Sequence, residues 1–115
     1  MPGPDFSLPV VGERYDNEDG TSRQQEIRKL QPGDPVELVR EKANPFDPSA
    51  VAVISERGVR VGYIGADRSA WIGSKIDKAM PIIAVVEAVK GSRRGTLPCK
   101  LIIRINLYGD VPKVA

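Results

Sequence analysis

The chain has 115 residues, 41% of them hydrophobic and 28% charged, and its 17 basic and 15 acidic residues leave a formal net charge of +2. These values predict one soluble globular domain. A net charge of +2 is not the strongly basic composition that is typical of non-specific nucleic-acid binders. No apolar run approaches the ~18 residues of a membrane-spanning helix, and the first residues lack the basic and apolar regions of a secretory signal. We therefore expect a cytoplasmic location and no membrane partner.

The chain contains no histidine and one cysteine, Cys99. These counts exclude an internal disulfide, zinc sites of the Cys/His type and nucleophilic triads that depend on histidine. The glycine-rich segment 91–95 lacks the strand, loop and helix order of a nucleotide-binding P-loop. We expect a buried structural thiol at Cys99, no cofactor and no catalytic activity.

Strands and one helix alternate in the first part of the chain. An apolar run predicts a strand over residues 6–12. After the polar insert 16–20, the segment 21–30 has the pattern of a short helix with Thr21 as the candidate N-cap, and a Gln-Pro-Gly-Asp sequence ends it. Alternation of apolar and polar residues predicts the next strand over 36–40.

A polar loop and a β-hairpin follow. The short side chains of Asn44 and Asp47 bond nearby backbone, and the proline after each of them fixes φ, so we expect a rigid loop. Short β-branched runs predict strands over residues 49–54 and 59–64, joined by the turn sequence Glu-Arg-Gly.

A second helix is predicted over residues 67–79, with Asp67 as its cap and Pro81 after its end. Its apolar residues recur at helical spacing and lie on or near one face: Ala70, Trp71, Ile72, Ile76 and Ala79. We expect Trp71 to pack this helix against the core.

The chain ends with two further strands, over residues 82–89 and 97–108, joined by a basic tip at 90–95. With Arg57 and Arg60 this tip is a candidate basic patch, although hairpin tips also carry solvated charges for solubility. The residues after the last strand are expected to fray.

Six short strands and two inserted helices predict a mainly β fold, a small antiparallel barrel of the OB or SH3 type. The expected division is a flexible N-terminus at 1–5, one barrel domain at 6–108 and a C-terminal tail at 109–115.

Four separated segments together resemble one known family. They read VVGxRY at residues 10–15, LxxGxxVxLxRE at 30–41, NPFDxxAVxV at 44–53 and VGYI at 61–64. In this order and spacing they resemble the HIRAN domain, which occurs alone in bacterial proteins and at the front of eukaryotic Swi/Snf-type helicases. The resemblance extends over roughly residues 6–107 and implies the same kind of barrel.

The resemblance implies recognition of the 3′ end of single-stranded DNA, with a pocket for the terminal nucleotide. The implied DNA-binding residues are Arg14, Tyr15, Asn44, Phe46, Asp47 and Tyr63. Arg14 aligns with a contact to the DNA backbone, and a guanidinium binds phosphate in a bidentate manner. Tyr15 and Phe46 offer stacking faces. Asp47 matches the carboxylate that accepts a hydrogen bond from the terminal hydroxyl, and Asn44 lines the same pocket.

The sequence departs from the family pattern near this pocket. Tyr63 stands where the eukaryotic members have histidine, and Gly65 and Ala66 stand where they have two lysines. An aromatic residue expected near the basic tip is also missing. Arg68 and Lys90 are the candidate backbone contacts that replace the lost positive charge.

Other interpretations stay open at this point. The chain could be a protein-interaction or assembly domain with a vestigial pocket, whose strand at 97–108 pairs with a partner through an exposed edge. A magnesium-dependent nuclease would need a carboxylate cluster, for which the candidates are Asp16, Glu18, Asp19 and Asp47. Tyr15 and Phe46 could be core aromatics, and Arg14 could pair with Glu41 or Asp47.

We favour a non-catalytic module that binds 3′ ends of single-stranded DNA and is linked to DNA repair or stalled-fork processing. A separately encoded helicase or repair enzyme is the expected protein partner. The oligomeric state is not predicted.

Overall fold

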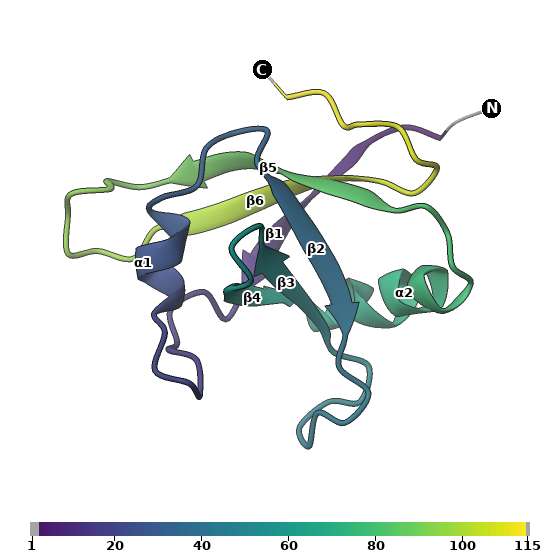
Figure 1. Ribbon diagram of the computed structural model, residues 1–115, viewed down its shortest axis with the longest axis horizontal. Coiled ribbons are helices and arrows are strands. Elements are labelled where there is room, and N and C mark those ends of the chain that lie inside the picture. The colour runs from purple at the N-terminus through teal and green to yellow at the C-terminus, as the bar shows by residue number, and fades with distance from the viewer. Residues whose placement is uncertain (1–2, 115) are drawn as a thin grey trace.

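The computed structural model describes residues 3–114 (Figure 1). Its elements, in chain order, are β1 (Phe6–Val11), α1 (Arg23–Ile27), β2 (Pro35–Arg40), β3 (Val51–Ser55), β4 (Arg60–Ile64), α2 (Ala66–Asp77), β5 (Ile83–Lys90) and β6 (Lys100–Asn106). The strands form a closed antiparallel barrel in the order β1-β4-β3-β2-β5-β6. The predicted fold class, a small antiparallel barrel with two helices, is therefore confirmed.

Alternating side chains of the strands fill the barrel. The fully buried residues of its core include Val51, Val53, Val61, Val86, Leu101, Ile103 and Ile105. Two register shifts interrupt the ladders, one in β3 between Val53 and Ile54 and one in β5 between Val86 and Ala88. Such bulges bend and twist strands, which helps a short sheet to close on itself.

Closure of the barrel corrects the alternative based on an exposed strand edge. That alternative used the strand predicted over 97–108, which forms β6 from Lys100 to Asn106. Leu8 of β1 pairs with Ile103 on one side of β6, and Val86 of β5 pairs with the same residue on the other. The backbone of β6 is thus satisfied on both sides, and it is not free to add a partner strand.

Helix α1 is shorter than predicted and has a different cap. Ser22, not Thr21, is the N-cap, and its side chain accepts a hydrogen bond of 3.1 Å from the backbone N–H of Gln25. Thr21 instead donates its hydroxyl to Asp19 at 2.6 Å. After Ile27 the chain continues in turns, and Ile27 itself is fully buried, as its apolar pattern predicted.

Helix α2 begins one residue before the predicted cap. Gly65 is its N-cap residue and makes no side-chain cap bond, so Asp67 lies in the first turn and does not cap the helix. Ile72 is fully buried, whereas Trp71 is 40% exposed and contacts Phe6 with a ring-centroid distance of 5.4 Å. Ile72 therefore provides the fully buried contact of α2 with the core, and Trp71 packs the helix on Phe6, which lies against the core. No helix within residues 3–114 has both the length and the apolar character to cross a membrane.

The hairpin between β5 and β6 has a longer loop than predicted, because β6 begins at Lys100 and not at Leu97. Within this loop Arg93 donates hydrogen bonds of 2.8 Å to the backbone carbonyls of Arg28 and Leu30. Cys99 is fully buried, which confirms the prediction of a buried thiol. The basic tip therefore contributes part of its charge to holding the loop against α1.

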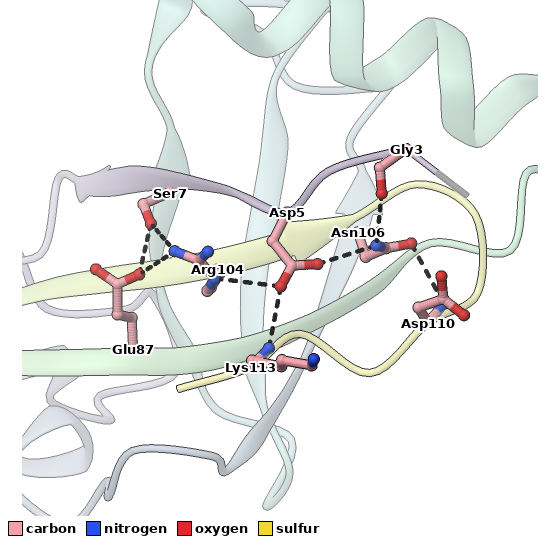
Figure 2. Close-up of polar contacts among 8 residues, drawn as sticks. All are labelled: Gly3, Asp5, Ser7, Glu87, Arg104, Asn106, Asp110 and Lys113. Carbon is pink, nitrogen blue, oxygen red and sulfur yellow. Dashed lines mark hydrogen bonds and ion pairs between the residues drawn. The ribbon is translucent and has the colours of Figure 1, made fainter. Parts of the chain in front are cut away.

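A polar network joins the two ends of the chain (Figure 2). Asp5 accepts hydrogen bonds from the Asn106 amide at 2.9 Å, from the backbone N–H of Lys113 at 3.0 Å and from Arg104 at 3.3 Å. Arg104 also donates to Glu87 at 3.1 Å. The hydrogen bond from Asn106 is the main cause that lowers the pKa of Asp5. The tail expected to fray is thus attached to the barrel through Lys113.

Candidate nucleic-acid interface

A cleft of about 1220 Å³ opens at one end of the barrel. One wall is the loop that joins β2 to β3, residues 41–50, which we call the 41–50 loop; it projects from the lower end of the barrel in Figure 1. The opposite wall includes the loop after β1 and the N-terminal end of α1. A smaller cavity of about 240 Å³ lies elsewhere, between α2 and β2, among apolar side chains such as Ile76 and Met80.

Most of the predicted DNA-binding residues meet in this cleft. Its lining includes Tyr15, Asn44, Phe46, Asp47 and Tyr63. The other candidates, Arg14, Arg68 and Lys90, are exposed and do not line it. The structure thus brings together residues from three separated sequence segments and leaves the predicted backbone contacts outside.

The 41–50 loop is shaped by its own polar side chains. The Asn44 side-chain oxygen accepts hydrogen bonds from the backbone N–H groups of Phe46 at 2.8 Å and Asp47 at 3.0 Å. One carboxylate oxygen of Asp47, Oδ1, accepts from the N–H of Ser49 at 2.8 Å. These are the local bonds by which Asn and Asp form turns, and they are the bonds on which the prediction of a rigid loop rests.

Two aromatic rings stand at the mouth of the cleft. Phe46 is 95% exposed and Tyr15 is 71% exposed, so the alternative that they are core aromatics is wrong. An exposed phenylalanine on a rigid loop buries almost no apolar area within the domain. Both rings therefore keep their faces free to stack with a ligand.

Glu41 connects the 41–50 loop to β4. Its Oε1 accepts hydrogen bonds from the Tyr63 hydroxyl at 2.8 Å and the Asn44 amide at 3.1 Å, and its Oε2 pairs with Arg60 at 3.0 Å. Burial, followed by the hydrogen bond to Glu41, raises the pKa of Tyr63. Tyr63 therefore stays a neutral hydroxyl donor at physiological pH and helps to hold the loop.

Arg14 makes no ion pair with Glu41 or Asp47, contrary to the alternative raised from the sequence. Its side chain is 64% exposed and lies 3.9 Å from Glu13. In the candidate basic patch, Arg57 pairs with buried Glu26 at 3.0 Å, whereas Arg60 lines the cleft.

The cleft contains basic residues that sequence reasoning did not assign to the pocket. Its lining includes Arg23, Arg40, Lys42 and Arg60. Arg40 and Lys42 both pair with Asp77 of α2. Spacing along the chain gives no sign that Arg23 belongs here, because its position depends on how α1 packs beside β4.

The carboxylates proposed for a nuclease do not form a metal site. Within residues 3–114, no group of three or more His, Cys, Asp or Glu side chains is close enough together to hold a metal ion. Glu18 and Asp47 both line the cleft, whereas the Asp19 carboxylate is bound by Thr21. The structure gives the nuclease alternative no support.

The sequence model of the HIRAN domain family matches residues 5–108. The chain belongs to the HIRAN domain family. HIRAN domains are DNA-binding modules and not catalytic ones.

Two crystal structures share this HIRAN fold. The HIRAN domain of human HLTF has a TM-score of 0.64 and 20% sequence identity, over 90% of this chain and 74% of that one. A protein from Lactobacillus plantarum has a TM-score of 0.64 and 21% identity, over 89% of this chain and 98% of that one. No curated protein sequence gives a significant match.

Proposed function

We propose that this HIRAN domain binds the 3′ end of single-stranded DNA in the cleft beside the 41–50 loop. It acts in the cytoplasm as a non-catalytic module in DNA repair or stalled-fork processing, together with a separately encoded helicase or repair enzyme. The observation that carries the proposal is Phe46, 95% exposed on a loop held rigid by its own hydrogen bonds, next to Asp47 in the same cleft.

The bases and the terminal hydroxyl of a strand end each have a matching group in the cleft. Bases stack on the free faces of Phe46 and Tyr15. The Oδ1 atom of Asp47 already accepts from Ser49, and within residues 3–114 its Oδ2 atom accepts no hydrogen bond. An ionised carboxylate accepts but does not donate, so Oδ2 suits a terminal hydroxyl and repels a terminal phosphate.

The remaining candidates have supporting roles in this proposal. Arg14 lies on the loop after β1, is 64% exposed and has only a long 3.9 Å ion pair with Glu13, which a phosphate of a strand stacked on Tyr15 would replace. Arg68 and Lys90 lie outside the cleft, so they act only on more distant phosphates through a screened interaction.

The test compares two labelled oligonucleotides that differ only in having a free 3′-hydroxyl or a 3′-phosphate, with binding measured by fluorescence polarisation at low salt. We expect tighter binding of the hydroxyl end. Asp47→Asn keeps an acceptor for the N–H of Ser49 and replaces the second oxygen with an amide donor, so it should remove the preference without unfolding the loop.

The outcomes separate the hypotheses. Equal, weak binding of both oligonucleotides would show generic electrostatic attraction and would contradict an end-specific pocket. A preference that survives in Asp47→Asn would contradict the role given to Asp47. Absence of binding at low salt would favour a protein-interaction domain whose cleft is vestigial.

A further inference from the structure

Arg23 is a buried cation whose protein partners are neutral. It is only 8% exposed. Its guanidinium donates to the backbone carbonyl of Gly12 and to the side-chain oxygen of Asn17, both at 2.7 Å, and no ion pair among residues 3–114 includes it. Buried charges in proteins are usually paired, because an uncompensated one pays a desolvation cost. An anion at this position would compensate it.

The Arg23 guanidinium also faces the cleft. Arg23 is one of the lining residues, and its Nη2 atom donates no hydrogen bond to residues 3–114 and is not shut off from solvent. The guanidinium lies 5.4 Å from the centre of the Tyr63 ring. An anion entering the cleft can therefore reach free N–H groups of Arg23.

Arg60 brings a second guanidinium to the same ring. It lies 5.6 Å from the centre of Tyr63, and one of its terminal nitrogens pairs with Glu41 at 3.0 Å. Its Nε atom is buried without a hydrogen-bond partner in the described part of the chain. Glu41 pairs with Arg60, so Arg23 is the guanidinium of the two that has no ion-pair partner among residues 3–114, and a single phosphodiester would supply one.

We propose that Arg23 and Arg60 form a phosphate site at the base of the cleft, which binds one internal phosphodiester of the strand. This inference rests on the proposed function and extends it, because it assigns the strand's backbone a fixed position relative to its 3′ end. A guanidinium suits this role, since its fork of N–H groups matches two phosphate oxygens.

The phosphate site supplies positive charge in place of the two lysines of the eukaryotic pattern. Ala66 stands at one of these positions and lines the cleft without a charge. Arg23 comes from α1 and Arg60 from β4. Positive charge thus reaches the same cleft from different elements, which sequence alignment at residues 65–66 does not detect.

Arg23 also has a purely structural interpretation, which the experiment must separate. By bonding Gly12 and Asn17 it holds the loop that carries Tyr15. A structural role would weaken all strands alike when Arg23 is replaced. A phosphate contact would instead depend on the charge of one particular linkage.

The experiment uses 3′-hydroxyl oligonucleotides in which a single phosphodiester is replaced by a neutral methylphosphonate, moved one linkage at a time from the 3′ end. With the wild-type protein, we expect one linkage at which neutralisation weakens binding at least about tenfold, as for a charge-assisted hydrogen bond. In Arg23→Gln, the fully charged strand should bind about as weakly, and the linkage effect should vanish.

Arg28→Gln is the matched control. Arg28 follows Arg23 by five residues, carries the same charge and bonds backbone carbonyls of Gly95 and Leu97, but it does not line the cleft. It should keep the linkage effect of the wild-type protein. Arg23→Lys keeps the charge without the fork and serves as a second variant if Arg23→Gln does not fold in thermal melts; we expect partial recovery of the linkage effect.

Several results would overturn the phosphate site. They are equal sensitivity at every linkage in the wild-type protein, a linkage effect that persists in Arg23→Gln, and the absence of any linkage effect in folded Arg23→Lys. Loss of the preference for a 3′-hydroxyl with the linkage effect retained would overturn the proposed end recognition alone. If no strand binds, thermal stabilisation by inorganic phosphate at matched ionic strength that disappears in Arg23→Gln would support the site, and its absence in the wild-type protein would overturn it.

Discussion

Replacing Phe46 with alanine should weaken DNA binding while leaving the fold intact. The ring is 95% exposed, so its removal takes away almost no buried contact, and the free energy of unfolding should change by less than ~0.5 kcal/mol. A base stacked on such a ring contributes ~1–3 kcal/mol in single-strand binders, which corresponds to a loss of affinity of about 5- to 150-fold. The substitution therefore separates binding from stability.

The assay is fluorescence polarisation with a single-stranded oligonucleotide that has a free 3′-hydroxyl, combined with a thermal melt of each variant. Leu97→Ala is the control, because Leu97 is also highly exposed, at 77%, but lies in the loop between β5 and β6. It removes a similar apolar side chain from the surface and should leave the affinity unchanged.

The reasoning is refuted if Phe46→Ala binds the strand within about twofold of the wild-type affinity, since that ratio corresponds to only ~0.4 kcal/mol. It is also refuted if both variants lose affinity equally, because exposed apolar area in general would then be responsible. A large drop in melting temperature for Phe46→Ala would show that the ring supports the loop.

Three further predictions concern stability. Gly62→Ala should destabilise the domain by about 3 kcal/mol in denaturant unfolding, because Gly62 has φ +153° and a Cβ would collide with Val10 in β1; an unchanged midpoint would contradict this. Glu26→Gln should lower the free energy of unfolding by about 2 kcal/mol, because the 4% exposed carboxylate accepts charge-assisted hydrogen bonds. A lower melting temperature in thermal melts would show this loss of stability. The pKa of Glu87 is lowered, chiefly by the Ser7 hydroxyl, so its contribution to stability is present above its ordinary value of 4.5 and is lost as the pH falls through the lower folded value. Ser7→Ala should shrink this acid-induced loss in melts recorded across that pH range, and an unchanged pH dependence would count against the assigned cause.

The barrel and the 41–50 loop were predictable because their determinants are local. Alternation of apolar residues marks the strands, and the turn made by Asn44 and Asp47 depends on side chains bonding backbone two or three residues away. Such bonds are readable from the sequence because both partners belong to one short segment.

Errors arose where neighbouring residues compete for one role. Thr21 and Ser22 are both able to cap α1, and the choice depends on Asp19, which binds the Thr21 hydroxyl. Trp71 and Ile72 are adjacent on α2, so they point in directions about 100° apart and only one can face the core. Ile72 occupies that position.

Arg23 and Glu41 could not be assigned to the pocket from spacing. Each lies in a segment whose local pattern is ordinary, and each acquires its role from distant partners: Arg23 from Gly12 and Tyr63, and Glu41 from Tyr63 and Arg60. Tertiary packing creates these contacts, so a sequence without the fold does not reveal them.

The polar network around Asp5 determines from which side of the barrel a fusion partner or a surface is attached. It anchors the segments just inside both ends of the chain, and these lie at the top of the barrel in Figure 1, whereas the 41–50 loop projects from the bottom. A fused enzyme, an affinity tag or a sensor surface joined at either end would therefore sit at the pole opposite the cleft. Immobilised or fused forms of the domain should keep the cleft open to solution.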